Sequence, residues 1–205
     1  MSQKRDIELL YEVGCLRFLQ RNWRQFLNAD FSNETEHSYR VAWIAMTLAS
    51  QEGVRDLGKV VRMALVHDVG ESRSGDVHYI SRLYTKRDEE MAIEDVFSET
   101  SLEKEMVALW KEYEERKVIE AKIVKDADNL DVEFELKEQE AKGEQIGKYW
   151  RDARKIVYQS LFTKSAKKMW EEVQKSNPHD WHFYARNRYT AGDWQKKKPL
   201  SNSKK

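Results

Sequence analysis

Apolar side chains recur every three or four positions along most of the chain, a period that is typical of amphipathic helices. The pattern predicts helices over residues 4–20, 37–50, 55–69, 86–98, 102–115, 118–142 and 149–173. Asn33 or Thr35 is expected to cap the second of these helices, and Gly53 to end it. No segment alternates apolar and polar residues over the length of a strand, so no strand is predicted.

Proline and glycine are scarce, which favours long helices over hairpins and tight loops. The chain has 2 prolines, Pro178 and Pro199, and 8 glycines in 205 residues. We therefore predict an all-α fold, a single compact helical domain of about six to eight helices over residues 1–177. Residues 178–205 are predicted to form a C-terminal extension that ends in a disordered basic tail.

Composition and charge exclude several classes of protein. Lys+Arg and Asp+Glu each number 36, so no basic surplus is available for a nucleic-acid binder that depends on phosphate attraction. The longest uncharged run in the apolar part of the chain is the 11 residues 41–51, too short to span a membrane. No signal peptide is evident, and Cys15 is the only cysteine, so we expect a cytoplasmic protein without disulfides.

Five histidines carry most of the candidate chemistry. His67-Asp68 ends an apolar helical stretch, Glu71 follows on the same side of the helix, and Asp76 lies in the next loop. His37 begins the preceding helix, and it would meet His67 in space if the two helices pack antiparallel. Two imidazoles and a carboxylate suit a divalent transition metal. A core histidine bonded to a helix terminus is the competing interpretation of His67.

A fourth ligand is expected from the helix predicted over residues 118–142. Asp126 and Asp128 lie about 200° apart on that helix, so they cannot face one site. Asp128 shares a face with apolar residues, where a carboxylate must be paired or metal-bound. Asp128 is therefore the better ligand, and Asp126 is expected to be solvated or to support a ligand. A surface role is expected for His78, and a surface or structural role for the second His-Asp pair, His179-Asp180.

The arrangement of these residues resembles the H…HD…D signature of the HD-domain phosphohydrolase superfamily. Within it, the chain is most similar to the HD-domain 5′-deoxynucleotidases, which hydrolyse deoxyribonucleoside 5′-monophosphates. The motifs that carry this resemblance lie within residues 7–135, and they are Glu36-His37-Ser38, His67-Asp68-x-x-Glu71, Gly75-Asp76 and Val124-Lys125-x-Ala127-Asp128. The resemblance implies that His37, His67, Asp68 and Asp128 bind one divalent metal ion, and that Glu71 and Asp76 act in catalysis.

Trp23 also matches the family, in which a tryptophan at this distance before the first histidine packs near the sugar and disfavours a 2′-hydroxyl. Bacterial members carry arginine directly before it, whereas this chain has Asn22, with Arg21 and Arg24 nearby. A guanidinium matches a phosphate bidentately, so either arginine could hold the substrate phosphate. The metal could be Mn, Co, Fe, Ni, Zn or Mg, and the family's members imply a homodimer. No membrane or nucleic-acid partner is expected.

Two alternatives remain open at the level of the sequence. A pyrophosphohydrolase acting on a nucleoside triphosphate or an alarmone would keep the metal site but needs further cations. The basic group Arg73, Arg82, Lys86 and Arg87 could supply them. A non-enzymatic helical module with a basic C-terminal arm is the other alternative, and it predicts strongly salt-dependent binding without a metal.

Overall fold

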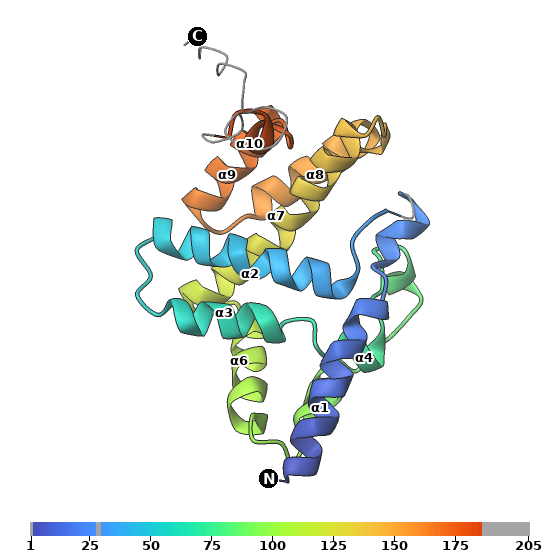
Figure 1. The fold of residues 1–205 in the computed structure, drawn as a ribbon, viewed down its shortest axis with the longest axis vertical. Coiled ribbons are helices and arrows are strands. Elements are labelled where there is room, and N and C mark those ends of the chain that lie inside the picture. The colour runs from blue at the N-terminus through green and yellow to red at the C-terminus, as the bar shows by residue number, and fades with distance from the viewer. Residues whose placement is uncertain (1, 28–29, 186–205) are drawn as a thin grey trace, which may run out of the picture.

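The computed structural model describes residues 2–27 and 30–185, and helices joined by loops make up this part of the chain (Figure 1). An isolated antiparallel bridge pairs Gln20 with Asn33. The α-helices are α1 (Gln3–Cys15), α2 (Glu34–Gln51), α3 (Leu57–Val66), α4 (Glu71–Ser74), α5 (Glu89–Phe97), α6 (Glu103–Glu115), α7 (Ile119–Ala141), α8 (Ile146–Ser160), α9 (Lys164–Lys175) and α10 (Asp180–Phe183). Short 3₁₀ turns are η1 (Leu16–Phe18), η2 (Asn22–Gln25) and η3 (Ser81–Leu83).

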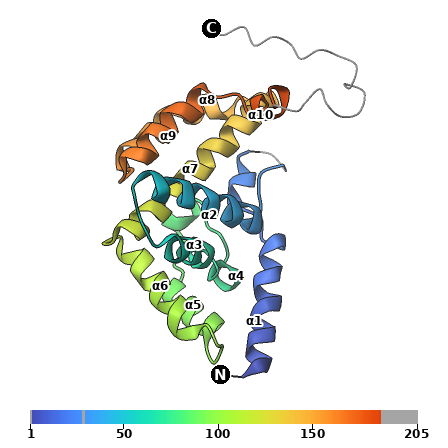
Figure 2. The same ribbon diagram turned by 60° about the vertical axis from the view of Figure 1, so that its left-hand side comes forward.

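Helix α7 is the centre of the fold, and it contacts α2, α3, α6, α8 and α9. Figure 2 shows α2 and α3 on one side of α7, while α8 and α9 lie at the opposite end of the molecule from α1. Ala121, Val124, Ala127 and Leu130 of α7 are fully buried. Because the core is built around this one helix, any polar side chain on its inner face needs a partner.

Short polar side chains start several helices where the sequence pattern predicts them. Asn33 forms a capping box with Glu36 at the start of α2, so of the two candidate caps it is Asn33 that acts. Asp56 caps α3, and Asp88 caps α5. Gly53, at φ +73°, follows the end of α2 as predicted. The start of α2 matters most, because it carries one of the candidate histidines.

The prediction of one continuous helix over residues 149–173 is wrong. The chain forms two helices there, α8 and α9, with a break between them. The break contains neither glycine nor proline. Asp126 of α7 causes it: its carboxylate accepts hydrogen bonds from the backbone N–H groups of Phe162 and Thr163 and from the Thr163 hydroxyl. Thr163 in turn caps α9. The expectation of a solvated Asp126 is also wrong, since its exposed fraction is 0%.

The predicted fold class is confirmed for the described residues. Eight helices have nine or more residues there, and α4 and α10 are single turns. No helix in the described ranges has the length and hydropathy to cross a membrane. The predicted disordered tail, Lys196 to Lys205, lies outside the described residues, and the domain boundary at residue 177 stays a prediction.

Candidate active site

Three helices bring the four predicted ligands together. His37 lies in the first turn of α2, and Asp128 lies in the middle of α7. His67 is the C-cap of α3, and Asp68 follows it. The atoms that His37, His67 and Asp128 offer all lie within 4.8 Å of one another. Asp68 Oδ2 is 3.0 Å from His67 Nε2 and 3.6 Å from His37 Nε2, so the fold gathers all four groups at one point.

Both imidazoles are held so that Nε2 faces this point. His37 Nδ1 lies 2.6 Å from Asp131 Oδ2, and His67 Nδ1 lies 2.7 Å from the Ala64 carbonyl. In a neutral imidazole these acceptors place the proton on Nδ1, so that Nε2 would offer its lone pair to a cation that takes the place of a second proton. The two Nε2 atoms are buried and make no hydrogen bond to any described residue. Each Nε2 instead faces a carboxylate, His67 at 3.0 Å from Asp68 Oδ2 and His37 at 3.3 Å from Asp128 Oδ1, and this set of donors fits a metal ion.

The surrounding charges also favour a cation there. Burial and Arg21 act to lower the pKa of His37, but the carboxylates of Asp131 and Asp128 outweigh them and raise it well above its usual range. Burial acts to raise the pKa of Asp128, but Lys125 and the two histidines hold it well below its usual range. The carboxylates therefore stay ionised, and the site stabilises positive charge between them.

A cavity of about 340 Å³ opens beside these ligands. His67, Asp68 and Asp128 line it, and so do both predicted catalytic residues, Glu71 and Asp76. Its wall also carries aromatic side chains and several arginines. The volume lies within the range of small-molecule sites. The four candidate ligands thus lie beside a space that a phosphorylated substrate could enter.

The two carboxyl oxygens of Glu71 differ in their contacts, because only one of them accepts a hydrogen bond. Its Oε1 accepts from Arg87 Nη1 at 3.0 Å, while its buried Oε2 has no hydrogen-bond partner among the described residues. Burial, together with the charges of Asp68, Glu34 and Asp76, raises the pKa of Glu71 to about 10. Arg87 therefore orients this carboxyl group, and Oε2 remains available to a ligand.

Asp76 is positioned by Asn22, the residue that replaces the arginine of the bacterial family members. Its Oδ2 accepts from the backbone N–H of Asn22, and its carbonyl accepts from the Asn22 side-chain amide. The preceding Gly75 has φ +72°, which allows the chain to turn after α4. Asn22 thus connects η2 to the loop that carries Asp76.

The three predicted substrate-binding residues are placed differently. Trp23 lines the cavity, and its ring centroid lies 4.9 Å from that of Trp150 and 5.8 Å from that of Tyr79. Arg21 is buried in the wall, with Nη1 3.5 Å from Glu34 Oε2 and 3.9 Å from Asp68 Oδ2. Arg24 is not part of the lining, and its Nε donates to the Phe31 carbonyl.

Comparison with known proteins identifies the family of the chain. A family model described as HD domain matches residues 13–177. This chain belongs to the HD domain family.

Two relatives and one solved structure extend that result. The 5′-deoxynucleotidase HDDC2 of Dictyostelium discoideum is 34% identical over 154 residues, which cover 69% of this chain and 77% of that protein. The human protein of the same name is 31% identical over 140 residues, covering 65% and 68%. A conserved hypothetical protein from Pyrococcus furiosus superposes with a TM-score of 0.67 at 27% identity, covering 83% of this chain and 99% of that chain.

One histidine of this HD domain was placed wrongly from the sequence. His78 was expected at the surface, but it is 5% exposed and lines the cavity. Its Nε2 lies 2.6 Å from Gln25 Oε1, and its Nδ1 accepts from the backbone N–H of Ile80. His78 therefore fixes the loop around Tyr79. The His179-Asp180 pair lies on the surface, as expected.

Asp131 is a further residue of the HD domain that the sequence analysis missed. It lies one turn after Asp128 on α7, is 1% exposed, and binds both His37 Nδ1 and Arg40 Nε. The spacing of three residues between Asp128 and Asp131 was the available signal, because it puts both on one side of α7.

Exchange of Asp131 for alanine is expected to weaken Mn²⁺ binding by about 10- to 100-fold, because His37 loses the group that fixes its tautomer and orientation. Isothermal titration of protein stripped of metal by EDTA measures this. Glu138→Gln is the matched control, since Glu138 also pairs with Arg40 but does not contact His37. Equal affinities for Asp131→Ala and the control would contradict the assigned role.

Proposed function

We propose that this chain is a metal-dependent phosphomonoester hydrolase that releases phosphate from 2′-deoxyribonucleoside 5′-monophosphates. The observation that carries the proposal is the pair of buried Nε2 atoms that make no hydrogen bond and face two carboxylates at the edge of a cavity. The names of the relatives support the substrate class, since both are 5′-deoxynucleotidases.

His37, His67, Asp68 and Asp128 would hold one divalent ion. Such an ion supplies Lewis-acid polarisation of a phosphate oxygen and lowers the pKa of bound water. A donor set of two imidazoles and two carboxylates accepts Mn, Co, Fe, Ni, Zn or Mg, so the ligands do not select one of them. Lys125 Nζ, 2.7 Å from Asp128 Oδ2, holds that carboxylate in place.

Glu71 and Asp76 act on protons at the reacting phosphate. Both line the cavity, and an oxygen of each lies within 4.8 Å of an oxygen of the other and of Glu34. Arg87, which also lines the cavity, orients Glu71, and Asn22 orients Asp76. Each can position the attacking water or donate a proton to the leaving 5′-oxygen. The free Oε2 of Glu71 favours Glu71 for direct contact with the substrate.

Trp23 and Arg21 bind the substrate. Trp150 and Tyr79 fix the Trp23 ring at the cavity wall, where its bulk can exclude a 2′-hydroxyl. Arg21 lies near Asp68 and is the nearer of the two predicted arginines to the ligand cluster. The geometry favours it over Arg24 as the partner of a phosphate oxygen, because Arg24 is engaged with the loop at Phe31.

The test is a panel of deoxy- and ribonucleoside 5′-mono-, di- and triphosphates, with phosphate release followed in Mn²⁺ or EDTA. The wild type is expected to prefer deoxyribonucleoside monophosphates and to lose activity in EDTA. Trp23→Ala should lower the ratio of deoxy to ribo kcat/KM by about tenfold. Trp181→Ala, at a tryptophan 78% exposed on α10, is the control. Equal wild-type rates on both sugars, or release unaffected by EDTA, would contradict the proposal.

No observation favours the pyrophosphohydrolase alternative. Arg82 and Arg87 line the cavity, but Arg82 donates to the Val77 carbonyl and Arg87 pairs with Glu71. Arg73 pairs with Glu12 outside the cavity. Three of the four predicted cations are therefore engaged within the protein, and the fourth, Lys86, does not line this cavity. The alternative of a non-enzymatic module is wrong, because the chain belongs to a family whose matched relatives are enzymes.

Two further expectations stay predictions, namely the homodimer and the cytoplasmic location. Sedimentation of the full chain and fractionation of cells that express it would test them.

A further inference from the structure

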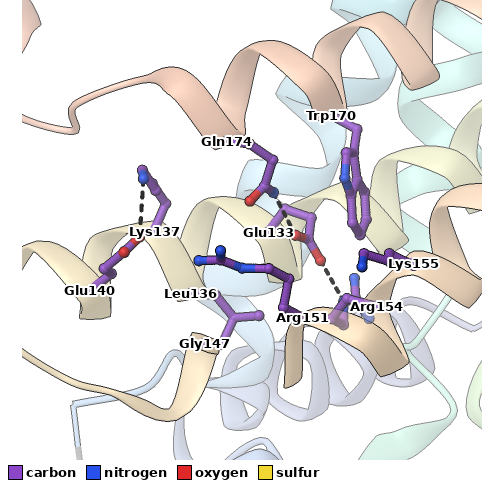
Figure 3. A pocket seen from close by; sticks show the side chains of 10 residues that line it. All are labelled: Glu133, Leu136, Lys137, Glu140, Gly147, Arg151, Arg154, Lys155, Trp170 and Gln174. Carbon is purple, nitrogen blue, oxygen red and sulfur yellow. Dashed lines mark hydrogen bonds and ion pairs between the residues drawn. The ribbon is translucent and has the colours of Figure 1, made fainter. Parts of the chain in front are cut away.

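A second cavity, of about 310 Å³, lies between α7, α8 and α9. Figure 3 shows Trp170 and Gln174 reaching into it from α9 and Arg151 from α8. Leu136 and Gly147 complete an apolar part of the wall. The cavity is open to solvent, since Arg151, Lys155 and Gln174 of its lining are exposed, so a dissolved ligand can reach it.

The lining has an excess of positive charge, although the whole chain has a net charge of zero. Four cations line it, Lys137, Arg151, Arg154 and Lys155, against two carboxylates, Glu133 and Glu140.

Both carboxylates already have partners, as the dashed lines in Figure 3 mark. Glu133 accepts from Arg154 and from Gln174, and Glu140 accepts from Lys137 at 3.0 Å. Local pairing therefore neutralises Lys137 and Arg154 and leaves the charges of Arg151 and Lys155.

Both cations are exposed, and the charge of Arg151 acts on Glu140 and Asp152 without a direct contact. Arg151 makes no hydrogen bond or ion pair with any residue that the structure describes. Lys155 pairs at 2.8 Å with Asp152, whose side chain is 90% exposed, and such surface pairs contribute little. A guanidinium and an ammonium without strong partners on one wall are suited to an oxyanion.

Three basic residues of α8 lie on the side of the helix that borders the cavity. Arg151, Arg154 and Lys155 have the spacing i, i+3, i+4, so they share one face of α8, and that face points at the cavity. None of the residues of α8 is fully buried. A helix that covers a domain usually does so with an apolar stripe. In α8 that stripe contains Trp150, Val157 and Tyr158, which are half-buried, as is Arg154, while Arg151 and Lys155 lie exposed at the edge of the cavity.

We propose that this second cavity is a binding site for a phosphate anion, either free inorganic phosphate or the terminal phosphate of a phosphorylated small molecule. Arg151 and Lys155 bind its oxygens, and Trp170 and Leu136 form the apolar floor. The site is separate from the candidate metal centre, and it does not depend on the proposed hydrolase activity. Arg154 lines both cavities, so it is left unchanged in the test.

Isothermal titration of the full chain with inorganic phosphate, and separately with adenosine 5′-triphosphate, tests the proposal. We expect saturable binding that Arg151→Gln/Lys155→Gln weakens at least tenfold. Lys148→Gln/Lys168→Gln, which removes two charges from α8 and α9 outside the lining, should bind like the wild type. Thermal melting verifies that both variants fold, and Arg151→Lys should retain more affinity than Arg151→Gln.

His67→Ala separates this site from the metal centre, and it is expected to keep the binding. Saturable binding of either probe supports the site. The probe that binds more tightly shows whether the site takes free phosphate or the terminal phosphate of a small molecule. No saturable binding by either probe at millimolar concentration, equal weakening in the two double variants, or loss of binding in His67→Ala would overturn the proposal.

Discussion

His67→Ala is expected to lower phosphate release from deoxyribonucleoside 5′-monophosphates by about 10³-fold or more, because a metal-assisted reaction loses several kcal/mol of stabilisation with its ion. His67 Nδ1 is already engaged with the Ala64 carbonyl, so only the buried Nε2 is available as a ligand. Steady-state assays with saturating Mn²⁺ measure the loss.

The second His-Asp pair of the chain provides a matched control. His179 precedes an aspartate as His67 does, but it lies exposed on the surface and near His182. His179→Ala should therefore leave kcat/KM unchanged. If His67→Ala and His179→Ala retained similar activity while both remained folded, the assignment of His67 as a ligand would be wrong.

Asp126→Ala is expected to lower the free energy of unfolding by about 3 kcal/mol, because it leaves buried donors without acceptors. The donors are the N–H groups of Phe162 and Thr163 and the Thr163 hydroxyl, all in the junction of α8 and α9. Urea unfolding followed by circular dichroism measures the change.

Asp152→Ala is the control for stability, since the Asp152 side chain is 90% exposed. It should change the free energy of unfolding by less than about 0.5 kcal/mol. Asp126→Asn keeps one acceptor oxygen, so its loss in free energy of unfolding should lie between those of Asp126→Ala and Asp152→Ala. A loss for Asp126→Ala no larger than that for Asp152→Ala would show that this carboxylate does not hold the junction.

The sequence predicted what depends on local pattern and on single helices. Helical period located α2, α3, α5, α6 and α7 but not the single turn α4, and the predicted caps applied to α2. The opposite faces of α7 distinguished Asp128 from Asp126. The meeting of His37 and His67 needed only that α2 and α3 pack side by side, as they do. The choice of Asp128 as a candidate ligand therefore rested on the geometry of one helix.

The rest depended on contacts between residues far apart in the chain. The break between α8 and α9 has no local signal, because an acceptor on α7 creates it. The role of Asn22 also has no local signal, because its hydrogen bonds to Asp76 join η2 to the loop after α4. The burial of His78 has none either, because Phe26 and Gln25 cover it. Periodicity within one helix carries no information about such partners.

The most direct test of the account is the number of Mn²⁺ ions that the stripped protein binds. Equilibrium dialysis with metal analysis should give one tightly bound ion per wild-type chain and none for His67→Ala or Asp128→Ala, with Asp126→Asn still binding one. A wild-type chain that bound no ion, or variants that bound as much as the wild type, would contradict the claim that two histidines and two aspartates form a metal centre.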